Sequence, residues 1–368
     1  MRARTIIIGG GVIGLLAARE LLIGGEPVTL LEAEHVGAGA SWAGGGILSP
    51  IEPWRHADAV TRLSLLSQRL YPGLVKTLAA DTGIDAQWCA TGMLSVVHEG
   101  PEEALAWAAS WRQDLTVVAH DELRRIEPGI GAIAQALWIP EIAQVRNPRL
   151  IKALHSDVMR RGGRIEEGVR VTGLGIHAGQ MEFVRTSRGE QPVDRCVVAA
   201  GAWSTELLSS AGIDVPITPV KGQMLMIRGQ SQDVRHIIQQ GPHYLVPRLD
   251  GRVLVGSTLE PAAGFDLTTT PTARGALHKA AIAMAPALAA RPVEAQWAGI
   301  RPGSPAGIPL IGAHPAANGL FVCAGHFRNG ILLAPGSARL LADVMLGRRP
   351  VLPIAPYSPA RDLTSKPI

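Results

Sequence analysis

Cysteine is scarce in this sequence of 368 residues, which contains only Cys89, Cys196 and Cys323. The three lie far apart and have neither a Cys-x-x-Cys spacing nor a Cys/His ligand spacing. Their pattern therefore gives no sign of a disulfide framework or a zinc site, and we expect no metal. So few thiols are typical of a reducing compartment, and we expect a cytoplasmic protein.

Charged residues are also sparse. They make up 18% of the chain, with 35 Lys and Arg against 31 Asp and Glu, for a net charge of +4. The basic residues occur in pairs such as Arg124–Arg125 and form no dense run. Such pairs are typical of a solvated surface, so we expect no nucleic-acid partner. The slight excess of positive charge suits an anionic cofactor and an anionic substrate.

Long apolar runs are missing as well. No uninterrupted apolar segment reaches about 18 residues, so we expect no transmembrane segment. The apolar N-terminus over residues 5–22 contains four glycines and the charged pair Arg19–Glu20, and no small-residue cleavage site follows it. These features argue against a signal peptide.

The same N-terminal segment has the pattern of a dinucleotide-binding unit. Thr5–Ile8 is a short β-branched run, typical of a buried parallel strand. It leads directly into a Gly-x-Gly-x-x-Gly sequence at residues 9–14, and a helical pattern follows as far as Leu22. A second predicted strand, Val28–Leu31, ends on Glu32.

Each part of this unit has a physical role. Gly9 allows a tight turn, Gly11 lets the backbone approach a pyrophosphate, and Gly14 lets the helix pack closely on the strand. The free N–H groups at the helix N-terminus favour phosphate, and the Glu32 carboxylate is placed to accept hydrogen bonds from ribose hydroxyls. The unit predicts a bound dinucleotide, either NAD or FAD.

Three further segments favour FAD. The small residues of Ala40–Gly46 resemble the segment that wraps the pyrophosphate and passes beside the isoalloxazine ring in the D-amino-acid oxidase family of FAD enzymes. Cys196–Ser204 resembles the strand and turn that return the chain to the cofactor domain in that family. Ala324–Pro335 resembles the segment that faces the flavin pyrimidine. The resemblance covers almost the whole chain and, within the family, is closest to the glycine oxidases of the thiamine pathway.

The resemblance implies an α/β fold with two domains, which the length of the chain also favours. One is a Rossmann-like FAD-binding domain of the glutathione-reductase type, and the other is an α+β substrate domain with an antiparallel sheet. We expect the FAD-binding domain to be discontinuous, over residues 1–85, 146–220 and 300–368. The substrate domain would comprise residues 86–145 and 221–299.

The resemblance also implies which residues contact FAD. Sarcosine oxidases tether their flavin through a cysteine, and residues 301–309 contain none, so we expect the FAD to be non-covalent. Carried over by position, the contacts come from the N-terminal unit, the small-residue segment, a strand expected over residues 169–174, and the two later segments. They are Gly9, Gly11, Val12, Ile13, Gly14, Glu32, Ala33, Ala40, Ser41, Gly45, Gly46, Ile47, Val171, Gly201, His326, Phe327, Arg328, Asn329, Gly330, Ile331 and Leu332.

An α-amino acid needs a fixed cation and a hydrogen-bond partner for its carboxylate. The resemblance assigns the cation to Arg301, whose guanidinium matches a carboxylate bidentately. It makes Tyr244 a second carboxylate partner, on a hairpin that an Asp-Gly turn predicts, and it places Arg328 facing the substrate. Ile47 and Leu259 would shape the apolar wall. Related enzymes often carry methionine at both positions, so the width of the pocket stays open.

No His/Asp pair or paired carboxylate stands where general-base chemistry would need it, and we expect no catalytic acid–base residue. The resemblance implies oxidative deamination of glycine, sarcosine or small D-amino acids by hydride transfer to the flavin. The products would be an imine or 2-oxo acid, ammonia and hydrogen peroxide, with molecular oxygen as acceptor. It also implies a homo-oligomer that supplies iminoglycine for thiamine thiazole synthesis.

Another amine substrate on the same fold, such as sarcosine, proline or a larger D-amino acid, stays open, and so do two alternatives of a different kind. One is a D-amino-acid or N-methyl-amino-acid dehydrogenase that uses an acceptor other than oxygen, because no motif separates the two kinds of acceptor. The other is an RNA-modifying flavin domain acting on tRNA. The sequence contains neither a fused methyltransferase half nor a basic tract, which disfavours the RNA-modifying alternative.

Overall fold

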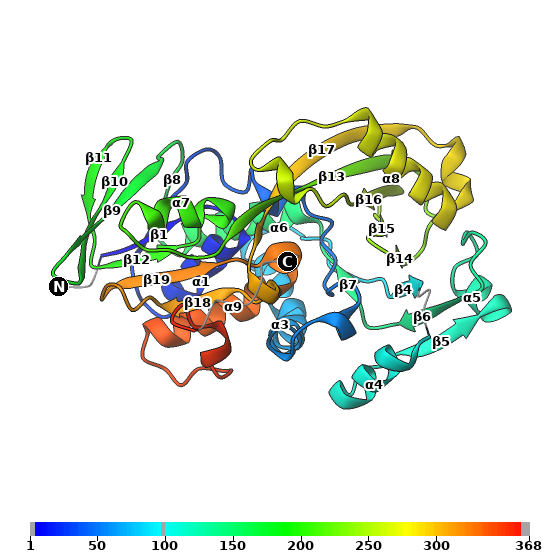
Figure 1. Cartoon of the computed structure of the whole chain (residues 1–368), viewed down its shortest axis with the longest axis horizontal. Helices are drawn as coiled ribbons and strands as arrows, with labels where there is room; N and C mark the ends of the chain where they lie inside the picture. Colours follow the sequence, from blue (N-terminus) through cyan, green and yellow to red (C-terminus); the bar gives the residue numbers. More distant parts are fainter. Residues whose placement is uncertain (1–3, 97–99, 362–368) are drawn as a thin grey trace.

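The protein has an α/β fold, seen in a computed structural model that describes residues 4–96 and 100–361. Two large sheets lie side by side, one of six strands and one of eight (Figure 1). Two long strands of the eight-stranded sheet, β13 (Thr218–Arg228) and β17 (Val293–Gly303), extend back toward the six-stranded sheet. The predicted α/β fold with a Rossmann-like unit is confirmed.

The six-stranded sheet has the order β18-β19-β12-β1-β2-β8. All neighbouring pairs are parallel except β18 and β19, which are antiparallel. Its strands are β1 (Thr5–Ile8), β2 (Val28–Leu31), β8 (Arg164–Glu166), β12 (Arg195–Val198), β18 (Leu310–Ala313) and β19 (Leu320–Ala324). Every residue of β1 is buried, as its apolar sequence predicts for a parallel strand covered on both faces.

Alternating residues of β1 pack into two different layers. Ile7 packs with four helices on one face of the sheet, whereas Ile6 and Ile8 pack with a three-stranded sheet on the other face. The helices are α1 (Val12–Ile23), α3 (Asp58–Thr82), α6 (Asn147–Arg160) and α9 (Gly330–Met345). The small sheet and its neighbouring helix comprise β9 (Val171–His177), β10 (Gln180–Thr186), β11 (Gly189–Pro192) and α7 (Ser204–Ser209). The strand expected over residues 169–174 is β9, which begins at Val171 and ends at His177.

The eight-stranded sheet has the order β17-β13-β16-β15-β14-β4-β6-β5. The remaining strands are β4 (Met93–Val96), β5 (Thr116–Ala119), β6 (Gln135–Ile139), β14 (Ile237–Gln240), β15 (His243–Pro247) and β16 (Arg252–Gly256). The predicted hairpin is confirmed by the antiparallel pair β15–β16. The sheet is not wholly antiparallel, because β14 and β4 pair in parallel.

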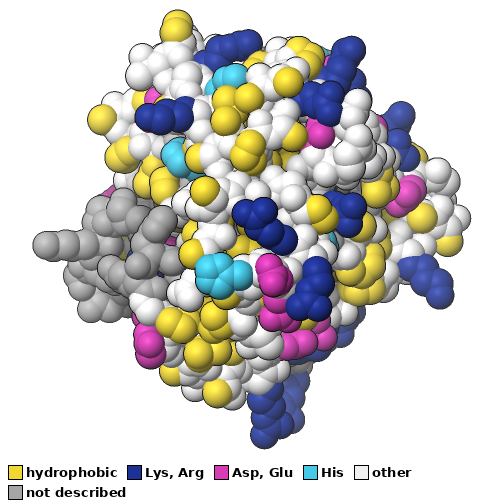
Figure 2. Space-filling model, turned by 90° about the vertical axis from the view of Figure 1, so that its right-hand side faces the viewer, with side chains coloured by type: hydrophobic (Ala, Val, Ile, Leu, Met, Phe, Trp, Pro, Cys, Tyr) yellow, Lys and Arg dark blue, Asp and Glu magenta, His cyan; other side chains and the backbone are white. Residues whose placement is uncertain are grey.

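Helices cover the outer parts of this sheet. α8 (Pro271–Met284) packs on one face through Leu277 and Met284, and α4 (Glu102–Trp111) and α5 (His120–Ile126) lie at the far end beside β5 (Figure 1). On that end of the molecule, basic side chains are scattered among acidic and apolar ones (Figure 2). No helix of the described residues is long and apolar enough to span a bilayer.

Short elements connect and flank the larger ones. They are α2 (Ala40–Ala43), the paired strands β3 (Cys89–Ala90) and β7 (Ala143–Gln144), and the 3-10 helices η1 (Pro53–Arg55), η2 (Gly201–Trp203), η3 (Pro261–Ala263), η4 (Pro286–Ala290), η5 (Pro305–Gly307), η6 (Phe327–Asn329) and η7 (Ala355–Tyr357). The six-stranded sheet is drawn from the three segments expected to bind FAD. The domain boundaries stay a prediction.

Candidate functional site

The loop between β1 and α1 and the first turn of α1 are too tightly packed to carry side chains at Gly9 and Gly14. A Cβ at Gly9 would lie 2.4 Å from the carbonyl oxygen of Ala199, and Gly9 has a φ of +110°. A Cβ at Gly14 would lie 1.9 Å from the carbonyl oxygen of Gly9. Because no side chain intervenes, the N–H groups of the first turn of α1 are presented directly at the edge of the sheet, where they favour an anion.

The Glu32 carboxylate is fixed beside this loop. It accepts hydrogen bonds from the backbone N–H groups of Gly10, at 2.7 Å, and Glu34, at 2.9 Å. A carboxylate has acceptor capacity beyond two bonds, so hydroxyl donors of a ribose can still be accommodated. The N–H of Val169 donates to the carbonyl oxygen of Glu32 at 2.8 Å, which brings the start of β9, and with it Val171, close to the same end of β2.

The small-residue segment runs from the helix N-terminus toward the eight-stranded sheet. Its Ser41 hydroxyl accepts a hydrogen bond from the N–H of Val12 at 2.9 Å, which fixes the start of the segment at α1. A Cβ at Gly45 would lie 3.0 Å from the ring of Tyr244, so the far end of the segment reaches the predicted substrate tyrosine. One short stretch of chain thus joins the predicted pyrophosphate site to the predicted substrate site.

Three side chains that the sequence did not single out hold this segment in place. Asn147 Nδ2 donates to the carbonyl oxygens of Ser41 (3.0 Å) and Gly44 (2.9 Å). Arg248 Nη2 donates to the carbonyl of Gly45 at 2.9 Å, and Trp297 Nε1 donates to that of Ala43 at 3.0 Å. Burial lowers the pKa of Arg248 to about 10, so it stays charged at neutral pH.

Residues 326–332 form the opposite boundary of the site. His326 is buried and shares a hydrogen bond of 3.0 Å with the Ser337 hydroxyl, and burial lowers its pKa to about 3, so the ring is neutral. In the part of the chain that the structure describes, the buried Asn329 Nδ2 has no hydrogen-bond partner. An unpaired buried donor costs free energy unless a ligand satisfies it. Together with the free N–H groups at the start of α9, it fits the acceptor-rich edge of the predicted FAD.

Arg301 lies on β17 with its guanidinium group above Gly222 of β13. A Cβ at Gly222 would lie 2.1 Å from a guanidinium nitrogen, so the glycine makes room for the cation. Nη2 donates to the Ser257 hydroxyl at 2.9 Å, and Nη1 donates to the carbonyl oxygens of Thr258 (3.2 Å) and Lys221 (3.3 Å). None of these acceptors is a carboxylate, so the positive charge is held in place without being neutralised.

Tyr244 is packed between two glycines. It is buried, and its hydroxyl lies 3.8 Å from Met224 Sδ. A Cβ at Gly256 would lie 2.1 Å from the ring, on the side of the neighbouring strand β16. With Gly45 on its other side, the ring has little freedom. Among the described residues, its hydroxyl has only the weak sulfur acceptor of Met224.

Arg301, Tyr244 and Arg328 lie near one another, because Arg328 affects the pKa of Arg301 and Tyr244 affects the pKa of both arginines. Burial, followed by the nearby charge of Arg328, lowers the pKa of Arg301, whereas Tyr244 and Glu260 raise it. Burial also lowers the pKa of Arg328, which Tyr244 and Glu52 oppose. Among the residues that the structure describes, no ion pair involves either arginine, so two cations face the site.

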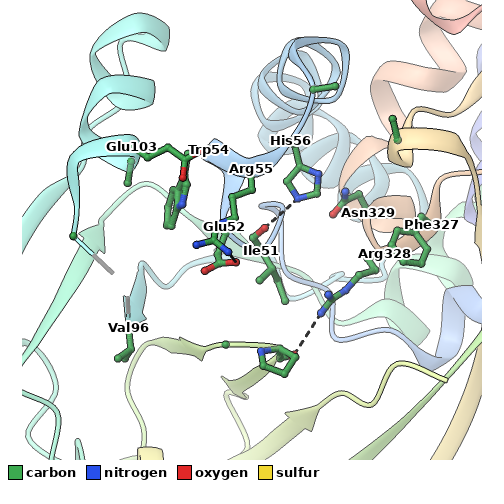
Figure 3. Close-up of a pocket in the computed structure, with 16 residues that line it drawn as sticks. Ile51, Glu52, Trp54, Arg55, His56, Val96, Glu103, Phe327, Arg328 and Asn329 are labelled. Carbon is green, nitrogen blue, oxygen red and sulfur yellow. Dashed lines mark hydrogen bonds and ion pairs between the residues drawn. The ribbon is translucent and has the colours of Figure 1, made fainter. Parts of the chain in front are cut away.

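Arg328 also lines a cleft of about 720 Å³. The cleft lies between η6, the 51–57 segment and α4, and Arg328 reaches across it toward the carbonyl of Pro242 at 3.4 Å (Figure 3). His56 stands on the 51–57 segment with Nε2 3.0 Å from the Ile51 carbonyl, and burial lowers its pKa. No sequence pattern predicted this cleft, because its walls come from several parts of the chain that lie far apart in sequence.

The two residues expected to form the apolar wall are placed differently. Ile47 packs against the apolar cluster that contains Tyr244, Met224 and Trp54. Leu259 is 47% exposed and lies outside that cluster. Its part in the pocket wall stays a prediction, and Ile47 is the one of the two that contacts the site. Within the described residues, no cluster of three or more His, Cys, Asp or Glu could hold a metal ion.

Comparison with known proteins agrees with this geometry. The family model described as "DAO: FAD dependent oxidoreductase" matches residues 4–344. A glycine oxidase of Pseudomonas aeruginosa is 43% identical over 98% of this chain and 99% of that protein. A bifunctional protein ThiO/ThiG of Synechocystis is 35% identical over 98% of this chain and 54% of its own length. The crystal structure of glycine oxidase from Geobacillus kaustophilus superposes with a TM-score of 0.92, at 30% identity, over 98% of this chain and 99% of that chain.

Proposed function

The chain belongs to the DAO family of FAD dependent oxidoreductases, and on that premise we propose that it oxidises the C–N bond of glycine and of small N-substituted glycines. The observation that carries the proposal is the un-neutralised Arg301 guanidinium beside Tyr244, at the point where the small-residue segment ends. The similarity to a glycine oxidase along nearly the whole chain supports glycine as the substrate.

The residues of the dinucleotide loop, the small-residue segment and the 326–332 segment suit the successive parts of FAD. The first turn of α1 and the Ser41 hydroxyl would hold the pyrophosphate, and Glu32 would hold the adenosine ribose. Gly45 and residues 326–332 would enclose the flavin ring, with Asn329 Nδ2 donating to it. Bound FAD supplies a two-electron acceptor that molecular oxygen reoxidises, with hydrogen peroxide as product.

Arg301 would bind the substrate carboxylate, because a guanidinium fork matches it with two parallel hydrogen bonds. The Tyr244 hydroxyl, which has only a sulfur acceptor in the structure, would donate a further hydrogen bond to the same carboxylate. Both groups are fixed by packing, so the substrate Cα is held in one place beside the ring enclosed by Gly45 and residues 326–332. Orientation of this kind supplies a large part of the rate enhancement when the protein provides no acid or base.

The charges of the site also favour the reactive form of the amine. With Arg301 paired to the substrate carboxylate, a substrate ammonium would still face the positive charge of Arg328, and a like charge disfavours the charged form. The pKa of the bound amine is therefore lowered, and its proton leaves to solvent without a resident base. The neutral amine then carries the lone pair that assists loss of hydride from Cα. Hydrolysis of the imine gives a 2-oxo acid and ammonia.

The cleft beside Arg328 is the reason for including N-substituted glycines among the proposed substrates. Glycine places only a carboxylate, one carbon and an amine in the site, whereas the cleft beside Arg328 has a volume of about 720 Å³. A substituent on the amine can extend into this space while the carboxylate stays at Arg301. Ile47 would limit how wide that substituent can be, because it packs in the cluster around Tyr244.

The further proposals concern the setting of the reaction. Similarity to a protein named ThiO/ThiG supports a place in the thiamine pathway, where the imine would be consumed by thiazole formation. Molecular oxygen as acceptor, a homo-oligomeric state and a cytoplasmic location are proposed on the resemblance and on the sparse cysteines. The two rival interpretations, a dehydrogenase with another acceptor and an RNA-modifying domain, are less well supported by these relatives.

The test is anaerobic mixing of the purified holoenzyme with glycine, sarcosine and D-alanine while flavin absorbance is followed. Bleaching by glycine and sarcosine is the expected result. Failure of all three amines to bleach the flavin would overturn the proposal. Peroxide release in air from the same mixtures separates an oxidase from a dehydrogenase, which would reduce its flavin without forming peroxide.

A further inference from the structure

The segment between β16 and Asp266 begins at the substrate anchor. Ser257 is buried, with 2% of its surface exposed, and its hydroxyl accepts the 2.9 Å hydrogen bond from Arg301 Nη2. The carbonyl oxygen of Thr258 accepts from Nη1 at 3.2 Å. Two of the three acceptors that hold the Arg301 guanidinium therefore belong to this segment, and the third is the carbonyl of Lys221.

The middle of the segment is tied to β13 through Lys221. The backbones of Lys221 and Glu260 exchange hydrogen bonds of 2.9 and 3.3 Å. The Lys221 ammonium, on a side chain that is 2% exposed, pairs with Asp266 at 2.6 Å. This hydrogen bond from Lys221 lowers the pKa of Asp266 to about 2, so the carboxylate is charged throughout the physiological range.

The far end of the segment reaches the six-stranded sheet. The Phe265 ring stacks on the Trp203 ring, with centroids 5.0 Å apart and planes at 29°. Trp203 ends η2, which begins two residues after Ala199, and the carbonyl oxygen of Ala199 would lie 2.4 Å from a Cβ at Gly9 of the dinucleotide loop. The two rings are 43% and 40% exposed, so the stack is a surface contact between the part that carries Arg301 and the part that carries the cofactor loop.

We propose that residues 257–266 form a positioning strap. One end of the strap orients Arg301, and the other end is attached to the cofactor-binding part through the contact of Phe265 with Trp203. This inference rests on the proposed role of Arg301 as the carboxylate anchor. A long side chain held by fixed acceptors loses less conformational freedom when its ligand binds, so the Ser257 end determines substrate affinity. The Phe265 end determines the distance between the anchor and the cofactor, on which the rate of the chemical step depends steeply.

The two ends therefore have different kinetic signatures. Ser257→Ala is expected to raise the glycine concentration for half-maximal flavin reduction several-fold while leaving the limiting rate unchanged. Phe265→Ala is expected to lower the limiting rate several-fold and to weaken FAD binding to the apoprotein, measured by quenching of FAD fluorescence. Phe265→Tyr keeps an aromatic ring and should restore both values.

The controls match each variant in burial or position. Ser64→Ala removes a buried hydroxyl that bonds within α3, away from the site, and Leu267→Ala removes an exposed side chain next to the strap. Both should behave as the unaltered enzyme. The strap proposal is wrong if Ser257→Ala leaves the glycine concentration for half-maximal flavin reduction unchanged. It is also wrong if Phe265→Ala leaves both the FAD affinity and the limiting rate unchanged.

Failure of the strap can be distinguished from failure of the proposed function. If glycine does not bleach the flavin of the unaltered enzyme, the proposed function fails, whereas the effect of Phe265→Ala on FAD affinity is still measured. If glycine bleaches the flavin and the strap variants match their controls, only the strap fails.

Discussion

The cofactor-binding part and the substrate-binding part recognise their ligands in different ways. Around α1 the ligand would be bound by backbone N–H groups. They are accessible because glycines stand at positions where a side chain would not fit. Around β17 the ligand would be bound by the long side chains of Arg301 and Tyr244. Backbone carbonyls and glycines of neighbouring segments orient these side chains. The first kind of site tolerates no added atom, whereas the second tolerates changes that preserve its charge and orientation.

The largest effect is expected where an atom is added to the cofactor loop. In Gly14→Ala the new methyl group would lie 1.9 Å from the Gly9 carbonyl, so the helix must move away from the strand. Overpacking of this kind destabilises by about 1–3 kcal/mol and here displaces the pyrophosphate site itself. The expected product is protein without bound FAD, measured by the ratio of flavin to protein absorbance. Gly73→Ala, where a Cβ meets nothing within 4 Å, is the control and should keep its FAD.

The next effect comes from removing charge at the substrate site. Arg301→Ala should lower kcat/KM for glycine about 1000-fold, near 4 kcal/mol, because the carboxylate would be left without its cation. The flavin spectrum and FAD content should be unchanged, since Arg301 lies on β17 of the eight-stranded sheet and not in the dinucleotide loop. A loss of less than tenfold would show that the carboxylate is anchored elsewhere.

Arg328→Met tests whether the positive charge of Arg328 lowers the pKa of the bound amine, through the pH dependence of flavin reduction. Removing one positive charge makes the bound ammonium less unfavourable, so the pKa of the bound amine should rise by about one unit. The rise of the flavin-reduction rate with pH, measured at saturating glycine, should then shift to higher pH by the same amount. An unshifted profile would mean that Arg328 does not face the amine.

Tyr244→Phe should have the smallest effect of the four. The ring stays between Gly45 and Gly256, and only one hydrogen bond to the carboxylate is lost. A net loss of about 1.4 kcal/mol, or tenfold in kcat/KM, is expected. If the loss approaches that of Arg301→Ala, the hydroxyl has a role in the chemistry beyond binding, and the assignment of a purely orienting role is wrong.

The same contrast explains what the sequence predicted. The order of strand, glycine loop, helix, strand and Glu32 is local, and the structure confirms each element from Thr5 to Leu31. The hairpin β15–β16 was equally local, because an Asp-Gly turn specifies it. These are the places where one short stretch of chain determines both its own conformation and its ligand.

What the sequence did not predict depends on contacts between distant segments. The parallel pairing of β14 with β4 joins strands that lie more than a hundred residues apart. Asn147 and Arg248 act by donating to carbonyls of the small-residue segment, and backbone acceptors leave no trace in a sequence pattern. Leu259 is 47% exposed, and its part in the pocket wall stays a prediction.

The packing of Tyr244 between Gly45 and Gly256 has a consequence for the engineering of substrate range. This wall of the site is rigid, and enlarging any of its three members would collide with the next. The 51–57 segment, by contrast, carries side chains such as Trp54 and His56 that border the open volume of the cleft. Libraries aimed at bulkier amines should therefore vary the 51–57 segment and leave the tyrosine and its two glycines unchanged.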